Sequence, residues 1–266
     1  MNKIRALIND DLDKIKNKLN QISGSNKLEF IDINSFICEG SKQIRSILAI
    51  LYLKSNNIEI TENIITLLSA GEIIHNASLL HDDVIDNAEY RRGKPNLSNI
   101  YSAGISVLTG DFLLSIAVKL LLELQNTKIL TSFLSSTQKM SNAEIFQYSK
   151  RNKDLSIEDY LIIAEGKTAS LFESILESSA ILADINTIQA KKFGRDFGII
   201  FQINNDFSED SIKNDIQNGL KTAVNILGIE KSSDFKDNYK QEMRKIIQTF
   251  PDNKYKQGLI DLIGKL

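Results

Sequence analysis

Apolar residues recur along this chain at spacings of three and four, which is the period of an amphipathic α-helix. One such series is Ile44, Ile47, Leu48 and Leu51, and another is Ile64, Leu67 and Leu68. Strand-like alternation of apolar and polar residues is scarce. The chain has only 2 prolines, so long tracts are left uninterrupted for helices. The pattern predicts an all-α protein.

The helices are expected in tracts separated by short turns. The expected ranges are about 3–22, 41–55, 61–88, 98–124, 127–149, 157–182, 187–209, 214–228, 234–249 and 254–264. Clusters of Gly, Pro, Asn or Ser lie between tracts, as at 23–26, 92–95 and 251–253. Because no internal repeat, linker or low-complexity block divides the chain, we expect a single domain over residues 1–266.

Composition limits the class of protein. A chain of 266 residues that is 42% hydrophobic can bury a sizeable core. Its net charge of −2, with acidic and basic residues mixed, gives no reason to expect nucleic-acid binding. The single cysteine, Cys38, cannot form an internal disulfide and fits a reducing cytoplasm. The charged first 20 residues predict no signal peptide or anchor, and no apolar run reaches the roughly 18 residues of a membrane span.

Three closely spaced aspartates stand just before two arginines in the segment 78–96. Asp82, Asp83 and Asp86 fall on about one turn of the helix expected there, and Arg91 and Arg92 follow it. Such carboxylates repel each other unless cations lie among them. Mg²⁺ is commonly held by one or two carboxylates together with substrate phosphates, and arginine donates forked hydrogen bonds to phosphate. The segment therefore predicts a site for Mg²⁺ and a diphosphate.

The alternative is a solvated acidic helix end beside a basic turn. Apolar residues directly before the acids argue against it, because they bury the helix that carries the charges. These residues are Ile73, Ile74, Leu79 and Leu80.

With further motifs in order along the chain, the sequence resembles the trans-isoprenyl diphosphate synthase (polyprenyl synthetase) family, and within it the long-chain polyprenyl diphosphate synthases. The resemblance covers roughly residues 38–225. The motifs are Gly40 to Arg45 (GSKQIR), Asp82 to Pro95, Gly110 to Leu114 (GDFLL), Gly166 to Ala169 (GKTA) and Phe201 to Ile203 (FQI). Each motif alone is weak, whereas their order and spacing are specific.

The resemblance implies a bundle of long antiparallel helices around a central cavity, usually paired as a homodimer. It implies that isopentenyl diphosphate is joined to an allylic diphosphate after the allylic carbon loses its diphosphate. By the same resemblance, Asp82 and Asp86 hold Mg²⁺, with Asp83 in support, and the metal stabilises charge on the leaving oxygens.

Roles for other residues follow from the resemblance in the same way. Arg91, Lys167 and Lys221 would bind the allylic diphosphate, and Lys42, Arg45, His75 and Arg92 would bind isopentenyl diphosphate. Thr168 and Gln202 would present oxygen dipoles to the carbocation, and released diphosphate would accept the proton.

Some of these residues also have ordinary structural explanations. His75 lies seven residues before Asp82, on the same face of the expected helix, but a lone helix histidine is more often packed or capping. Lys42 and Arg45 are three apart, which suits a diphosphate but also a solvated helix face. Lys167 after Gly166 could be a surface lysine, although the glycine lets backbone approach a phosphate.

The second acidic segment departs from the family pattern of Asp-Asp-x-x-Asp. Asn205 and Glu209 stand at its first and last aspartate positions, and only Asp206 is kept. All three can still offer oxygen to a cation, so we expect weaker metal binding here. Lys221 stands one residue beyond a family lysine position at Leu220. These changes fall on the second metal segment and on part of the allylic diphosphate site.

Two other functions fit parts of the sequence. A regulatory subunit of a heteromeric synthase would explain the altered second segment, but the intact first motif favours an active enzyme. A terpene cyclase shares the fold and first motif. Its second motif places Asn, Ser and Glu four residues apart, and the series that begins with Asn204 and Ser208 ends at Ile212.

Small residues precede the first motif at positions where short-chain relatives commonly carry an aromatic ring. Here Ala77 and Ser78 leave room for a growing tail to pass along the helix. We expect a product of twenty carbons or longer, such as a quinone side chain.

Overall fold

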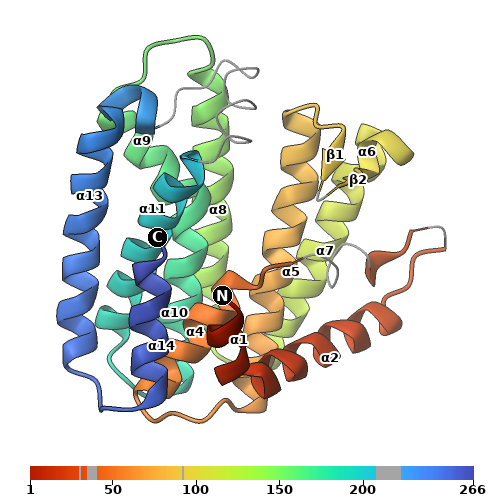
Figure 1. The fold of residues 1–266 in the computed structure, drawn as a ribbon. Coiled ribbons are helices and arrows are strands. Elements are labelled where there is room, and N and C mark those ends of the chain that lie inside the picture. Colours follow the sequence, from red (N-terminus) through yellow and green to blue (C-terminus); the bar gives the residue numbers. More distant parts are fainter. Residues whose placement is uncertain (30, 35–40, 92, 208–222) are drawn as a thin grey trace. The chain divides into compact units, whose positions relative to one another are not determined.

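The structure, a computed structural model, describes residues 1–29, 31–34, 41–91, 93–207 and 223–266 (Figure 1). They are mostly helical, which confirms the all-α prediction. The helices are α1 (Asn2–Leu7), α2 (Asn9–Ser25), α4 (Ile44–Ser55), α5 (Glu62–Ile85), α6 (Leu97–Ile100), α7 (Ala103–Glu123), α8 (Thr127–Ser149), α9 (Ile157–Ile163), the π-helix η1 (Ala164–Ala169), α10 (Ser170–Leu182), α11 (Thr187–Asp206), α13 (Ala223–Gln248) and α14 (Lys254–Gly264). Among these residues the only strands are β1 (Tyr90–Arg91) and β2 (Lys94–Pro95).

The chain falls into two compact units. The amino-terminal unit comprises Asn2–Ile50 and Ile60–Leu130, and the carboxy-terminal unit comprises Leu51–Glu59, Thr131–Leu266 and Met1. The expectation of a single domain over residues 1–266 stays a prediction.

Helix α5 forms the centre of the amino-terminal unit, where α7 lies along it and α2 also packs against it (Figure 1). It begins at Thr61, whose side-chain oxygen accepts a hydrogen bond from the Ile64 N–H, as is typical of a helix N-cap. Every residue from Ile64 to Ile74 is buried. Burial along so much of α5 holds the acidic end of the helix in a rigid position.

The acidic end of α5 differs from the prediction in one detail. The helix ends at Ile85 rather than at residue 88, because Asn87 adopts a left-handed conformation with φ of 49°. An unpredicted hairpin of β1 and β2 follows, in which Arg91 pairs with Lys94. Gly93 in its turn has φ of 77°, a conformation that glycine adopts without strain.

In the carboxy-terminal unit, α10 and α11 pack at very short range. A Cβ atom on Gly198 would lie 2.4 Å from the Ala169 Cα, and one on Gly194 would lie 2.5 Å from the Phe172 carbonyl oxygen. Only glycine at these positions lets α11 approach η1 and α10 so closely. The ring of Phe172 also packs against Phe197, with 5.3 Å between ring centroids.

The predicted helix 157–182 contains an interruption. The segment Ala164–Ala169 is a π-helix, and α9 and α10 flank it. Such turns are rare and often occur at functional sites. The predicted helices 3–22 and 98–124 are also divided, at Ile8 and at 101–102. Between the predicted helices 214–228 and 234–249 the break is a single non-helical residue, Gly228, and residues 214–222 lie outside the described ranges.

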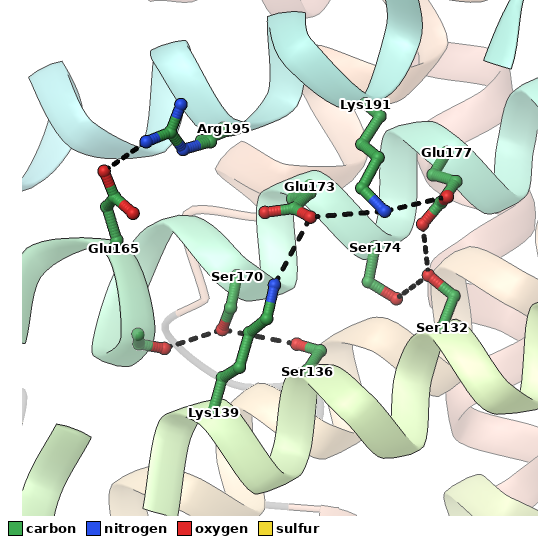
Figure 2. Close-up of polar contacts among 11 residues, drawn as sticks. Ser132, Ser136, Lys139, Glu165, Ser170, Glu173, Ser174, Glu177, Lys191 and Arg195 are labelled. Carbon is green, nitrogen blue, oxygen red and sulfur yellow. Dashed lines mark hydrogen bonds and ion pairs between the residues drawn. The ribbon is translucent and has the colours of Figure 1, made fainter. Parts of the chain in front are cut away.

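Polar side chains join α8, α10 and α11 (Figure 2). Ser132 Oγ donates to Glu177 Oε2 at 2.7 Å, and Lys191 Nζ lies 3.1 Å from Glu177 Oε1. Lys139 and Lys191 each lie 3.5 Å from Glu173 Oε1. Because acids and bases alternate, this network is a balanced structural link with no excess charge to attract a ligand.

One helix of the described chain, α7, is long and apolar enough to cross a membrane by length and composition alone. Its most apolar window has a mean hydropathy of 1.9, and 44% of that window is buried. A core helix meets the same criterion, so this feature by itself does not indicate a membrane span.

Candidate functional site

The three aspartates of the first motif occupy the last turn of α5 and the residue after it. The Asp86 N–H donates to the Asp82 carbonyl at 2.8 Å, so these two residues are one helical turn apart. Both are partly exposed, whereas Asp83 is only 2% exposed. The motif therefore divides into an outer pair, Asp82 and Asp86, and an inner residue, Asp83.

Asp83 binds the hairpin that follows α5. Arg91 Nε donates to Asp83 Oδ1 at 2.8 Å, and Arg91 Nη2 donates to the same oxygen. A charge-assisted bond to a buried carboxylate is stronger than a neutral one. We predicted that Asp83 supports the metal and that Arg91 binds diphosphate. In this structure the two residues bind each other, and their roles toward metal and diphosphate stay predictions. Arg92 lies outside the described residues.

The first motif offers two partly exposed carboxylates, Asp82 and Asp86, as donors for a metal. Within the described ranges, no three His, Cys, Asp or Glu side chains converge as a metal site. Mg²⁺ does not need three, because it keeps several waters and commonly takes one or two carboxylates plus substrate phosphates. Asp82 and Asp86, one turn apart and partly exposed, fit such an ion.

A histidine that the sequence reasoning missed lies next to the motif. His81 Nε2 is 3.3 Å from the Val107 carbonyl oxygen and 3.3 Å from Asp111 Oδ1, both on α7. Its ring occupies the space beside Gly110, where a Cβ atom would lie 2.2 Å from His81 Nε2. The signal in the sequence for this contact was the motif that contains Gly110 and Asp111.

The early basic motif is only partly on a helix. We expected Lys42 and Arg45 on one helix, but α4 begins at Ile44 and Gln43 has φ of 48°, so Lys42 precedes the helix. The solvated-face alternative is wrong for Arg45, which is 6% exposed. Burial lowers the pKa of Arg45 to about 10, and the negative charge of Glu72 opposes this shift.

Glu72 is a second residue that the sequence reasoning missed. It is 2% exposed on α5 and accepts hydrogen bonds from Ser46 Oγ at 2.7 Å and from Ser41 Oγ at 3.2 Å. A buried acid with two hydroxyl donors fixes the start of α4 against α5. It therefore sets the position of Arg45.

The residues connected with chain length, Ala77 and Ser78, lie about one helical turn before Asp82. Ala77 is 0% exposed, whereas Ser78 is partly exposed and its Oγ donates to the His75 carbonyl oxygen at 2.8 Å. His75 is partly exposed on the same helix, which carries Asp82 two turns later. Only Ser78 of the two small residues thus has an accessible surface.

In the carboxy-terminal unit the π-helix η1 carries Lys167 and Thr168. Lys167 Nζ lies 2.6 Å from Glu144 Oε2 and donates to Gln147 Oε1 at 3.0 Å. Thr168 Oγ1 donates to Gln202 Oε1 at 2.6 Å, so two predicted site residues are in direct contact.

The second acidic segment is partly inside the protein. Asp206 is 4% exposed and accepts from Gln202 Nε2 at 2.8 Å and from Tyr160 OH at 2.7 Å. Its carboxylate, predicted as a metal ligand, is therefore engaged within the unit. Asn205 is partly exposed, and Glu209 and Lys221 lie outside the described residues.

Comparison with known proteins identifies the family. A family model described as polyprenyl synthetase matches residues 30–259. The chain therefore belongs to the polyprenyl synthetase family, which confirms the resemblance read from its motifs.

Individual relatives agree with this assignment. The chain is 31% identical over 210 residues to "Solanesyl-diphosphate synthase 2, chloroplastic" of Oryza sativa, covering 75% of this chain and 52% of that protein. It is 33% identical over 212 residues to octaprenyl diphosphate synthase of Haemophilus influenzae, covering 77% and 64%. The chain thus spans about half to two thirds of the length of these relatives.

A solved structure shares the fold. It is that of polyprenyl synthase from Caulobacter crescentus complexed with calcium and isoprenyl diphosphate. The TM-score is 0.88 at 22% identity, over 98% of this chain and 95% of that one. This likeness confirms the isoprenoid synthase fold.

Proposed function

We propose that this protein is a prenyltransferase that joins isopentenyl diphosphate to an allylic diphosphate. The allylic C–O bond breaks, and diphosphate leaves with the electron pair. The double bond of isopentenyl diphosphate then attacks the allylic carbon, and the released diphosphate takes the proton. The observation that carries the proposal is the pair of partly exposed carboxylates, Asp82 and Asp86, at the end of a buried helix.

The proposed metal is Mg²⁺, held by Asp82 and Asp86. When bound, it would stabilise the charge that develops on the leaving diphosphate oxygens. The chain's own contribution is the position of these carboxylates. Asp83 supports it by fixing the hairpin through Arg91. Calcium and isoprenyl diphosphate in the Caulobacter crescentus protein support a divalent cation in this role.

Basic residues would bind the two diphosphates. For isopentenyl diphosphate we propose Lys42, Arg45, His75 and Arg92. For the allylic diphosphate we propose Lys167 and Lys221, together with Arg91 if substrate draws it from Asp83. Lys167 already pairs with Glu144, which holds the ammonium group in place. On substrate binding, the ammonium would exchange this carboxylate partner for a phosphate oxygen. Thr168 and Gln202 would present oxygen dipoles to the carbocation.

The proposed product has twenty carbons or more, as in a polyprenyl chain for a quinone. The names of the octaprenyl and solanesyl relatives support it, together with the small Ala77 and Ser78. We also propose a cytoplasmic homodimer. Exposed apolar side chains on α7 support the pairing, namely Val107 at 38%, Leu108 at 64% and Leu122 at 54% exposure.

The second candidate function is a weak or regulatory subunit of a heteromeric synthase. The observation in its favour is Asp206, which is held by Tyr160 and Gln202 inside the carboxy-terminal unit. With Asn205 neutral, the second segment then offers less charge to a metal than the family pattern Asp-Asp-x-x-Asp would.

One experiment tests these functions. The purified chain is incubated with Mg²⁺, isopentenyl diphosphate and farnesyl diphosphate, and the products are separated by chromatography. We expect elongated prenyl diphosphates. Cyclic hydrocarbon from farnesyl diphosphate alone would indicate a cyclase, and turnover only after a partner synthase is added would indicate the regulatory subunit.

A further inference from the structure

Three hydrogen bonds join Tyr160 of α9 to Thr168 of η1 through α11. Tyr160 OH donates to Asp206 Oδ2 at 2.7 Å, Gln202 Nε2 donates to Asp206 Oδ1 at 2.8 Å, and Thr168 Oγ1 donates to Gln202 Oε1 at 2.6 Å. Tyr160 and Asp206 are each 4% exposed, and Thr168 is 8% exposed. Tyr160, Asp206 and Thr168 are therefore largely shielded from water, whereas Gln202 between them is partly exposed. In a shielded environment hydrogen bonds are strong and unpaired polar groups are costly.

The carboxylate determines the direction of every bond in the series. An ionised Asp206 can only accept, so the Gln202 amide must turn its NH₂ toward it. The amide oxygen then faces Thr168, whose hydroxyl must donate. A reversed Gln202 amide would place its oxygen against the carboxylate. Thr168 consequently keeps its oxygen lone pairs directed away from Gln202.

The backbone that carries Thr168 is fixed from several sides. Ser170 Oγ donates to the Gly166 carbonyl oxygen at 2.6 Å, and Glu165 pairs with Arg195 of α11 (Figure 2). The close approach of Gly198 to Ala169 fixes the end of η1. With the backbone held, Thr168 can still rotate about χ1 and about its C–O bond, and the hydrogen bond to Gln202 restricts both rotations.

We propose that Tyr160 is a positioning residue that, through Asp206 and Gln202, fixes the Thr168 hydroxyl with its lone pairs available to a carbocation. Asp206 then anchors the amide and is not a metal ligand. The inference rests on the proposed prenyl transfer, in which an oxygen dipole stabilises developing positive charge. A dipole that is already oriented needs no reorganisation during the reaction.

The test compares Tyr160→Phe and Asp206→Asn with Tyr239→Phe as the matched control. Tyr239 is half-buried and packs against the same apolar cluster as Tyr160. We expect Tyr160→Phe to lower kcat about three- to tenfold, the effect of one hydrogen bond. Asp206→Asn, which lets the Gln202 amide reverse, should lower kcat by more. In both variants, KM for isopentenyl diphosphate and the Mg²⁺ concentration for half-maximal rate should stay unchanged. The control, Tyr239→Phe, should have the kcat of the parent.

A double-mutant cycle separates positioning from stability. In a Thr168→Ala background, Tyr160→Phe should cause no further loss of kcat, because the group it positions is gone. Full additivity of the two losses would overturn the proposal. A second result would also overturn it: Asp206→Asn needs a far higher Mg²⁺ concentration for half-maximal rate, while Tyr160→Phe keeps the parent's kcat. Asp206 would then act as a metal ligand.

A measurement of stability, which needs no enzyme turnover, distinguishes failure of this inference from failure of the proposed function. Urea unfolding of Tyr160→Phe, Thr168→Val and the double variant should show non-additive midpoint shifts, because both residues belong to one series. Coupling in unfolding without any elongation by the parent would refute prenyl transfer but not the hydrogen-bond series. Additive midpoints would refute the series itself.

Discussion

Asp83 Oδ1 accepts a hydrogen bond from Arg91 Nε at 2.8 Å, and this joins the end of α5 to the hairpin that follows it. The Asp83 side chain is 3% exposed and the Arg91 side chain 38%. Asp82 and Asp86, by contrast, are both partly exposed. Three aspartates that look equivalent in the sequence therefore have different surroundings, and their substitutions should have different effects.

Substitution of Asp82 should affect turnover, whereas substitution of Asp83 should affect stability first. We expect Asp82→Ala to lower kcat about a hundredfold or more with an unchanged melting temperature, because it removes a metal carboxylate. Asp83→Asn should lower the free energy of unfolding by about 1–3 kcal/mol, because Arg91 loses its charged partner. Steady-state kinetics and urea denaturation measure the two effects. Near-normal turnover of Asp82→Ala would refute the metal assignment.

Gly110→Ala should displace the His81 ring. The new Cβ would lie 2.2 Å from His81 Nε2, so the ring must leave the Val107 carbonyl oxygen and Asp111. Overpacking of this kind costs about 1–3 kcal/mol in the free energy of unfolding. In the double variant Gly110→Ala/His81→Ala the clash is gone, so its loss should be smaller than the sum of the single losses. Additive losses in urea denaturation would show that the ring is not the obstacle.

Gly198→Ala should be more damaging, because its Cβ would meet backbone rather than a movable ring. The nearest atom is the Ala169 Cα at 2.4 Å, so α11 must move away from η1. We expect a loss of about 2–3 kcal/mol in the free energy of unfolding. Gly24→Ala in α2 is the control, because no atom lies within 4 Å of the added Cβ. It should raise stability by up to about 1 kcal/mol through helix propensity. Equal effects at the two glycines would contradict this packing.

Sequence periodicity predicted α5 and α8, and the spacing of the aspartates predicted the acidic motif, because each depends on local pattern. It did not predict β1 and β2, since strands of 2 residues are too short for any alternation to show. It also missed η1, whose segment has ordinary helix-forming residues. The feature that accompanies this π-helix is a tertiary contact, the approach of Gly198 to Ala169, which no local pattern contains.

For the candidate site, the sequence likewise predicted some features and missed others. The residue types and order at Asp82, Lys167 and Gln202 were sufficient to place them in a family. The different roles of Asp82 and Asp83 depend on where α5 ends and on where the hairpin turns back. Tyr160 lies 42 residues before Gln202 in the chain and on another helix, and only the folded structure shows that both donate to Asp206.

Stability at high pH should depend on Tyr52, whose ring packs between Phe193 and Phe250 at centroid distances of 5.1 Å each. Burial raises the pKa of Tyr52 above its ordinary value. A raised pKa in the folded state means that the unfolded chain ionises first. The stabilisation is therefore complete below about pH 10 and is lost as pH rises above it.

Tyr52→Phe removes this ionisation. Relative to the parent, the variant should gain about 1 kcal/mol in the free energy of unfolding between pH 9 and pH 11. Urea denaturation at both values measures the gain, and Tyr148→Phe, at an exposed tyrosine, is the control. A parent and a variant that respond to pH in the same way would contradict the burial argument.

Product length should respond to the surface of α5 before the aspartates, and the structure separates its two small residues. Ala77 is 0% exposed, so a phenylalanine there would overpack the unit, whereas Ser78 is partly exposed and can accept a ring. We expect Ser78→Phe to shorten the longest product while leaving the first condensation intact, because a ring blocks the tail and not the diphosphates. Ser78→Ala removes the bond to the His75 carbonyl without adding bulk, so it should leave chain length unchanged. Chromatography of products from both variants measures the effect. A product of full length from Ser78→Phe would mean that the tail does not pass along this face of α5.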